Sequence, residues 1–393
     1  MKINQPSLTK KLKKSNKNKT AKESRRNFLS YGATLLAGLP FISKSEAATE
    51  TQKIPKLVGD SGSYAKVPLV KDVINLGLVQ SVVNPVDGKN PAPGMKKNLD
   101  HMLWLIDAAQ NYGGHKDYLA FHEFPITGWD QWTRNEILGF AISLPGHETE
   151  AIGQKAKEHD CYISFGTYAQ YKEWPRHIMS VSVLIDPKGR IVSEQWKARN
   201  IHGVFVGFEL FTTTVYDVLD RYVEMYGWDA VLPVAKTDIG NIAISPCQME
   251  PEIYRGLAMK GAELIIKTSS GGYNHIDTAT VAQVNKLYTC IVNNSVSPEN
   301  ASFAESAGGG GTAVFDPRGN KVAEADTHHE EIVSTKLPMR AFRKNHKIPD
   351  IHHELIAHIT DQYVSRYGPN GFLNYLPEGL KEAGEFFLKK SRW

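Results

Sequence analysis

The chain has 393 residues, of which 22% are charged, 41% are hydrophobic and three are cysteines. This ordinary globular composition excludes a disordered, collagen-like or disulfide-scaffold protein. No apolar run approaches the roughly 20 residues of a membrane-spanning helix. The net charge of +4 is uneven, because residues 1–48 carry nine Lys and two Arg against two Glu, which leaves the remainder at −5. The basicity therefore belongs to a leader and does not indicate a nucleic-acid-binding face.

The leader has the order of features of a twin-arginine export signal. The sequence S-R-R-N-F-L at 24–29 is followed by a short apolar stretch, Tyr31–Ile42, and by the small-x-small sequence Ser45–Ala47. The apolar stretch is too short to span a bilayer. We therefore expect recognition of residues 1–47 by the twin-arginine export machinery, cleavage after Ala47, and a periplasmic or otherwise exported mature protein.

The mature chain opens with a polar stretch, residues 48–72, that we predict to be a linker or surface arm. The first half of the domain that follows combines short apolar strand candidates with a segment, Lys96–Tyr112, that has the 3,4 spacing of an amphipathic helix. It predicts, in order, a strand at Val73–Gln80, a helix at Lys96–Tyr112, a strand at Tyr118–Phe124, a helix at His147–His159, an extended Cys161–Phe165 and a hairpin of Met179–Asp186 with Ile191–Trp196.

The second half repeats this layout. It predicts a strand at Asn241–Ser245, a helix at Pro251–Lys260, a strand at Glu263–Ile266, a helix at Thr278–Leu287, a strand at Thr289–Asn293 and a hairpin of Ala313–Asp316 with Lys321–Ala325. Both hairpins turn at a D-P-x-G sequence, which has good turn chemistry. The repetition predicts an internally duplicated α/β fold, an α-β-β-α sandwich in which two sheets pack face to face and helices cover their outer faces.

Residues 346–393 are predicted to be a C-terminal extension. They hold too much apolar area to leave in water, so they either fold back on their own domain or cover a neighbouring subunit. The apolar residues are Ile348, Ile351, Leu355, Ile356, Tyr363, Tyr367, Phe372, Leu373 and Tyr375.

Cys247 is the candidate nucleophile. It follows a predicted strand and Pro246, and a helix begins four residues later at Pro251. A thiol at such a turn is exposed near the positive end of the helix, which favours the thiolate. Cys161 and Cys290 lie inside apolar strand candidates, where an unpaired cysteine is usually a small buried hydrophobe.

Two charged residues also close predicted strands. Glu123, between aromatic neighbours, is a candidate general base. Lys197 carries an ammonium that could stabilise an oxyanion on a carbonyl under attack. Each residue alone reads more simply as a solvated surface charge, so the hypothesis depends on the three together, in the order Glu, Lys, Cys.

Over roughly residues 73–345 the chain resembles the nitrilase superfamily of carbon–nitrogen hydrolases. The resemblance includes the Glu-Lys-Cys order, P-E-I-Y-R-G-L-A-M-K-G-A-E-L-I-I after Cys247, and G-G-G-T-A-V-F-D-P-R-G-N near residue 310. The stretch from Pro251 to Ile266 is most similar to the aliphatic amidase and formamidase branch. The Trp-Glu that follows the cysteine of true nitrilases is absent here.

The resemblance implies a four-layer α-β-β-α sandwich and a catalytic Glu123, Lys197 and Cys247. It also implies a second active-site Glu, for which Glu209 is the nearest candidate, although the residues between Lys197 and Glu209 depart from the usual pattern. Family members are commonly homo-oligomers built on dimers. No metal or organic cofactor is expected.

The sequence thus predicts a hydrolase that converts a small carboxamide to a carboxylic acid and ammonia through a cysteine thioester. The alternatives are a nitrilase or an N-carbamoyl amide hydrolase with the same residues, a papain-like cysteine protease, and a non-catalytic exported binding or assembly protein. The histidines of H-H-E-L-I-A-H at 352–358 do not form a zinc motif, because His353 and His358 are five residues apart rather than four.

Overall fold

The computed structural model describes residues 57–200, 211–246, 250–304 and 308–393. The leader and its cleavage site lie outside these residues, so export stays a prediction. Among the described residues, no helix is both long and apolar enough to cross a bilayer.

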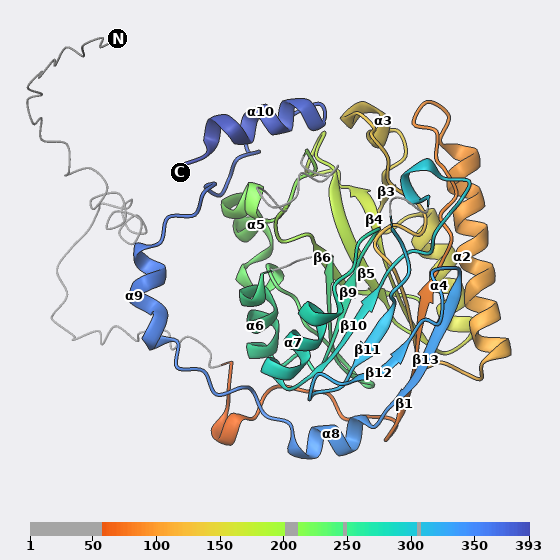
Figure 1. Cartoon of the computed structure of the whole chain (residues 1–393), viewed down its shortest axis with the longest axis vertical. Coiled ribbons are helices and arrows are strands. Elements are labelled where there is room, and N and C mark those ends of the chain that lie inside the picture. The colour runs from red at the N-terminus through yellow and green to blue at the C-terminus, as the bar shows by residue number, and fades with distance from the viewer. Residues whose placement is uncertain (1–56, 201–210, 247–249, 305–307) are drawn as a thin grey trace, which may run out of the picture. The chain divides into compact units, whose positions relative to one another are not determined.

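Two β-sheets form the centre of the described body (Figure 1). The first has the order β13-β1-β2-β4-β5-β6, with β3 paired to β4, and the second has the order β12-β11-β10-β9-β8-β7. The strands of the first sheet are β1 (Ile74–Gln80), β2 (Tyr118–Phe121), β3 (Ile142–Ser143), β4 (Tyr162–Gln170), β5 (Met179–Ile185), β6 (Ile191–Trp196) and β13 (Glu331–Leu337). Those of the second are β7 (Ala235–Thr237), β8 (Gly240–Pro246), β9 (Leu264–Thr268), β10 (Tyr288–Val292), β11 (Ala313–Phe315) and β12 (Lys321–Glu324).

Helices lie on the two outer sides of this pair of sheets, α2 and α4 on one side and α6 and α7 on the other (Figure 1). The α-helices are α2 (Ala92–Tyr112), α3 (Arg134–Leu138), α4 (His147–Glu158), α5 (Leu219–Tyr226), α6 (Pro251–Met259), α7 (His275–Asn285), α8 (Met339–Asn345), α9 (Glu354–Gln362) and α10 (Leu380–Lys390). The short 3₁₀ helices are Asp60–Gly62, Tyr216–Val218, Trp228–Ala230 and Ala301–Phe303.

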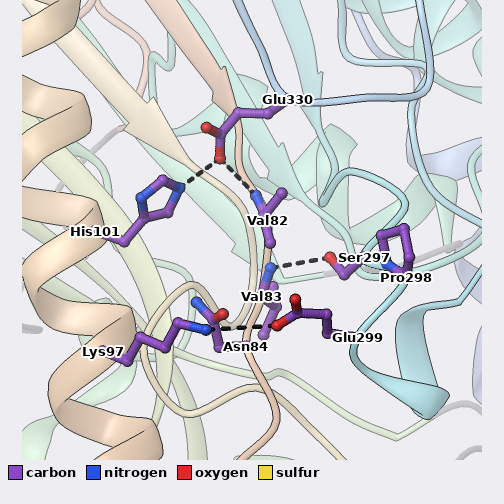
Figure 2. Close-up of a pocket in the computed structure, with 9 residues that line it drawn as sticks. All are labelled: Val82, Val83, Asn84, Lys97, His101, Ser297, Pro298, Glu299 and Glu330. Atoms are coloured by element: carbon purple, nitrogen blue, oxygen red, sulfur yellow. Dashed lines mark hydrogen bonds and ion pairs between the residues drawn. The ribbon is translucent and has the colours of Figure 1, made fainter.

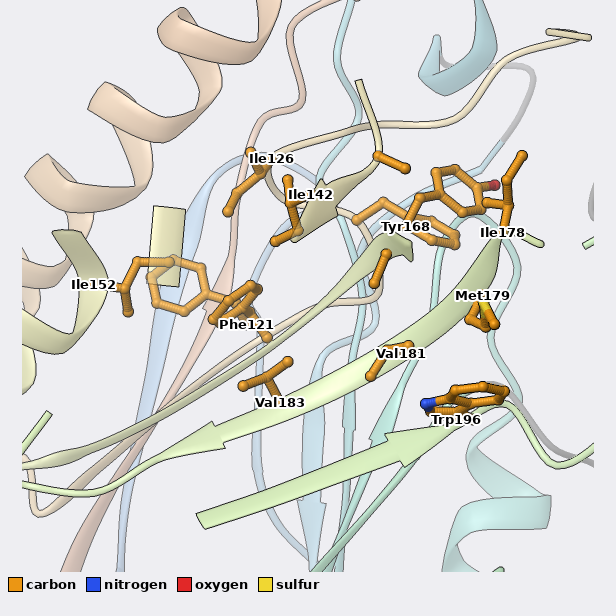
Figure 3. Close-up of a cluster of buried hydrophobic side chains, with 14 of the residues drawn as sticks. Phe121, Ile126, Ile142, Ile152, Tyr168, Ile178, Met179, Val181, Val183 and Trp196 are labelled. Atoms are coloured by element: carbon orange, nitrogen blue, oxygen red, sulfur yellow. The ribbon is translucent and has the colours of Figure 1, made fainter. Parts of the chain in front are cut away.

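The period-2 alternation of the strands sorts their side chains between the layers. On β2, Tyr118 and Ala120 belong to the cluster between the two sheets, whereas Leu119 and Phe121 belong to the cluster beneath α2 and α4. Figure 3 shows the outer cluster, where Phe121 lies beside Ile152 of α4. A third cluster joins the second sheet to α6 and α7. These three apolar interfaces make the fold the predicted α-β-β-α sandwich.

The two hairpin turns are built alike, which supports the internal duplication. Asp186 Oδ1 accepts the N–H groups of residues 188 and 190 at 2.9 Å each. Asp316 Oδ1 accepts those of residues 318 and 320 at 2.8 and 3.0 Å. The glycine of each turn, Gly189 or Gly319, has a positive φ of 72° or 83°, which a residue without a Cβ adopts readily.

The sequence patterns missed several elements and misplaced the bounds of others, such as β4, which continues five residues past its predicted end at Phe165. β13 was not predicted, yet it pairs antiparallel with all of β1 and so carries a late part of the chain into the first sheet. β3, β7, α3, α5, α8 and α10 were also not predicted. β2 ends at Phe121, three residues before the predicted end, because the chain then leaves the first sheet and the Glu123 N–H donates to Ser269 O beyond β9.

The C-terminal extension folds back on its own domain in part. Phe372 is fully buried and Phe387 nearly so, both in the cluster beneath α2 and α4. The buried guanidinium of Arg134 donates to Pro377 O at 2.8 Å and so ties the extension to α3. Helix α9, in contrast, has no buried residue. A homo-oligomer that covers α9 stays a prediction.

Candidate active site

Glu123 and Lys197 meet in the interior beyond the ends of two strands of the first sheet. Glu123 lies two residues past β2, and Lys197 directly follows β6. Lys197 Nζ donates to Glu123 Oε1 at 3.1 Å, and only 5% of Lys197 and 3% of Glu123 is exposed. A buried carboxylate is compatible with folding when a cation and hydrogen bonds compensate its charge. The structure thus brings together two of the predicted site residues, 74 positions apart in the chain.

The second carboxylate oxygen of Glu123 also has a donor. Ser270 Oγ donates to Glu123 Oε2 at 2.6 Å. Ser270 lies two residues past β9 of the second sheet, so the carboxylate is held from both sheets at once. Ser270 was not predicted from the sequence, and only its place just after an apolar strand could have suggested it.

The main chain at Lys197 is fixed by its neighbours. Its N–H donates to Ser180 O at 2.8 Å, and its carbonyl accepts the N–H of Val215 at 3.1 Å. These two hydrogen bonds fix the main chain of Lys197 just after β6, and its buried side chain extends from there to Glu123.

His122 holds the chain next to Glu123. It is fully buried, and its Nδ1 accepts the Phe124 N–H at 3.3 Å, which assigns the proton to Nε2. Nε2 then donates to Ser81 Oγ at 2.9 Å. Burial lowers the pKa of His122 to about 3, so this imidazole stays neutral and acts as a hydrogen-bonded brace between the ends of β1 and β2.

Cys247 and Glu209 lie outside the described residues, but the elements that flank Cys247 are described. β8 ends at Pro246, which pairs in parallel register with Thr268 of β9. The next residue of that strand segment, Ser269, accepts the Glu123 N–H through its carbonyl. The end of β8 and the main chain of Glu123 are therefore both neighbours of the end of β9.

A salt bridge connects the segments that follow Lys197 and Cys247. Arg199 Nε pairs with Glu250 Oε1. Arg199 lies two residues after Lys197, and Glu250 lies three residues after Cys247 and precedes α6. This contact places Arg199, two residues after Lys197, beside Glu250 at the start of α6.

The two other cysteines are buried, as predicted. Cys161 and Cys290 are both fully covered and free of disulfides. Burial raises the pKa of the Cys161 thiol to about 12 and raises that of Cys290 as well. Neither sulfur is available as a thiolate near neutral pH.

Comparisons with known proteins identify the family. A carbon–nitrogen hydrolase family model matches residues 84–344, two thirds of the chain. The chain belongs to the carbon–nitrogen hydrolases of the nitrilase superfamily. The fold agrees: an amidase from Nesterenkonia sp. aligns with a TM-score of 0.54 at 14% identity, covering 75% of this chain and 100% of that one. Saccharomyces cerevisiae Nit3, a member of branch 10 of the superfamily, aligns with a TM-score of 0.56 at 17% identity, covering 71% of this chain and 96% of that one.

A pocket of about 600 Å³ in this carbon–nitrogen hydrolase lies beside α2, and Glu123 and Lys197 do not line it. Its charged walls are already paired (Figure 2). His101 Nε2 lies 2.6 Å from Glu330 Oε2, and Lys97 Nζ lies 3.5 Å from Glu299 Oε2. The pocket is therefore separate from the Glu123–Lys197 pair, and its charged side chains contact one another.

One cluster in the described part of this carbon–nitrogen hydrolase has the composition of a metal site. The ligand atoms of Asp107, Glu158 and His159 lie within 4.8 Å of one another. Lys155 Nζ, however, contacts Asp107 at 2.8 Å and Glu158 at 2.9 Å. One ammonium thus bridges the two carboxylates, and His159 Nε2 lies 2.7 Å from Asp107, so the cluster forms a surface salt-bridge network.

Gly166 of β4 leaves room for the chain at Glu123. A Cβ at this position would lie 2.2 Å from the Glu123 carbonyl oxygen and 2.8 Å from its Cα. Both are main-chain atoms, so Gly166→Ala must displace the main chain of Glu123 and disturb its contact with Lys197. Because a shift of about 1 Å can cost roughly 100-fold in rate, we expect a kcat/KM loss of that order on the best substrate of the enzyme.

Steady-state kinetics with a thermal melt separate this displacement from unfolding. The matched control is Gly384→Ala on α10, where an added Cβ meets no atom within 4 Å. The control should keep full activity. A folded Gly166→Ala enzyme with the kcat/KM of the wild type would show that the position of Glu123 does not matter.

Proposed function

We propose that this carbon–nitrogen hydrolase cleaves small carboxamides to carboxylic acids and ammonia through a thioester on Cys247. The observation that carries the proposal is the buried contact of Lys197 with Glu123, which lies beside the end of the strand that leads to Cys247. A carboxylate and an ammonium beside a thiol are the groups that acyl transfer from an amide requires.

In the first half-reaction, Glu123 accepts the proton of the Cys247 thiol and the sulfur attacks the amide carbon. Lys197 stabilises the negative charge that develops on the carbonyl oxygen. Glu123 then returns the proton to the nitrogen, the C–N bond breaks, and ammonia leaves a thioester on the sulfur.

In the second half-reaction, Glu123 takes a proton from water, and the hydroxide attacks the thioester carbon. Lys197 again stabilises the oxyanion. The C–S bond breaks, the sulfur recovers a proton from Glu123, and the acid departs. The two half-reactions add one water to one amide and regenerate the enzyme.

Two observations favour an amide over a nitrile. Gln248 and Met249 follow Cys247 in place of the Trp-Glu of true nitrilases. The structurally similar Nesterenkonia protein is described as an amidase, in complex with acrylamide in one of its structures. We assign Glu209 as the second active-site Glu on sequence grounds alone, and the same grounds support export and assembly into homo-oligomers.

A substrate panel read by ammonia release and intact mass tests this proposal. Small amides, the corresponding nitriles and N-carbamoyl compounds are offered to the wild type and to Cys247→Ala. We expect ammonia from amides, an acyl adduct that maps to Cys247, and neither signal with the variant. Full ammonia release by Cys247→Ala, or an adduct on another residue, would refute the thioester mechanism.

A further inference from the structure

We propose that Ser270 is a positioning residue that holds the Glu123 carboxylate for proton transfer. The inference rests on the proposed function, because Glu123 needs a fixed orientation only if it serves as the base. The observation behind it is the 2.6 Å hydrogen bond from Ser270 Oγ to Glu123 Oε2.

The two oxygens of Glu123 have different partners. Oε1 accepts from the Lys197 ammonium and Oε2 accepts from the Ser270 hydroxyl. Each carboxylate oxygen has two acceptor sites, so each keeps one for the proton of the nucleophile. With one donor on each side, the carboxylate plane cannot rotate freely about its last torsion. Without Ser270, the lysine at one oxygen would be the sole donor to that carboxylate among the residues that the structure describes.

The turn that carries Ser270 is held on both sides. The Ser269 N–H donates to Val292 O at 2.9 Å, and Ser269 Oγ donates to Gly272 O at 2.9 Å. These bonds close the turn at 269–272 against the end of β10.

Two fully buried amide side chains fix the same turn from beyond β10. Asn294 Oδ1 accepts the Gly271 N–H at 2.6 Å, and Asn293 Nδ2 donates to Gly271 O at 2.7 Å. A hydroxyl on such a turn is preorganised, which is what a supporting contact to a reacting group requires.

The experiment compares Ser270→Ala with Ser270→Thr, which keeps the hydroxyl at a half-buried position. The control is Ser164→Ala, which removes a buried serine hydroxyl bonded at 2.8 Å to Tyr118 and not to Glu123. Kinetics on the best amide give kcat and KM. Iodoacetamide alkylation, mapped to Cys247 by mass, gives a second rate that needs no substrate. Thermal melts report folding.

We expect Ser270→Ala to lower kcat by about 10- to 100-fold, as loss of one hydrogen bond to a charged group implies. KM should change by no more than about twofold, since the contact orients the base and does not bind substrate. Alkylation of Cys247 should slow in parallel. Ser270→Thr should recover most of both rates, and Ser164→Ala should leave both unchanged among folded molecules.

Glu123→Gln separates the two ways in which the inference could fail. If this variant slows alkylation and Ser270→Ala does not, the role of Ser270 is overturned while the proposed function stands. If Glu123→Gln leaves alkylation and turnover unchanged, Glu123 is not the base and both proposals fall. A Ser270→Thr enzyme as slow as Ser270→Ala would also overturn the inference, because the hydroxyl would then not be the group that matters.

Discussion

Replacing Lys197 by Met is expected to lower kcat by about 10²- to 10³-fold, the usual effect of removing one oxyanion donor. The ammonium is proposed to stabilise charge that exists only after the sulfur attacks, so KM should change little. The substitution keeps the aliphatic length of the side chain and removes its charge. Turnover of the best amide, measured as kcat and KM separately, checks the prediction.

Loss of Lys197 also leaves the carboxylate of Glu123 buried without its cation, so a stability cost must be separated from the catalytic one. Lys267→Met is the matched control. Lys267 is also buried on a strand of the sandwich and ion-paired, with Asp277 of α7. Both variants should melt earlier than the wild type, but only Lys197→Met should lose kcat per folded molecule. Equal kcat values for the two variants would remove Lys197 from the mechanism.

Glu263→Ala is expected to destabilise the protein by about 3–5 kcal/mol, the range for breaking a buried ion pair. The fully buried carboxylate receives Nε and Nη2 of Arg343 at 2.7 and 2.8 Å. It also accepts the Asn241 N–H at 2.7 Å and the Tyr64 hydroxyl at 2.5 Å. The substitution leaves the Arg343 charge buried without its carboxylate, and urea unfolding gives the change in free energy.

An exposed ion pair on α8, the helix that also carries Arg343, provides the comparison for this loss of stability. Arg340 of α8 pairs with Asp72, and both side chains are more than half exposed. Asp72→Ala should therefore cost less than about 1 kcal/mol. Glu263 precedes β9 and Ser270 follows it, so the length of the strand separates this cluster from Glu123, and kcat of folded Glu263→Ala should match the wild type. If Glu263→Ala lowered the free energy of unfolding no more than Asp72→Ala does, the contacts of Glu263 with Tyr64 and Arg343 would not hold α8 to the second sheet.

The helices and strands between residues 73 and 345 that had strong periodic patterns were predictable from sequence. α2 is an example, since Leu99, Met102, Ile106 and Ala109 recur at the spacing of one helix face and all four are buried. β13 was not predictable in the same way. Its stability comes from seven residue pairs with β1, which lies more than 250 positions away in the chain. A local sequence pattern cannot indicate a pairing partner at that distance.

Glu123 and Lys197 were predictable as candidates because charged residues at the ends of apolar strands are unusual and because their order matched a known family. Ser270 and Gly166 were not. Ser270 acts through a hydroxyl on a turn of the second sheet. Gly166 acts through the absence of a side chain. Both residues support Glu123 only because the fold brings the ends of strands from the two sheets close to one another.

Local sequence, then, determined which segments become strands and helices and which residue types could react, because periodicity and side-chain chemistry are properties of neighbouring positions. The contact of Glu123 with Lys197, the support from Ser270 and the burial of Glu263 were decided by the tertiary structure. Each depends on groups from distant segments being removed from water together, and the free energy of that step is set by the packing of the two sheets.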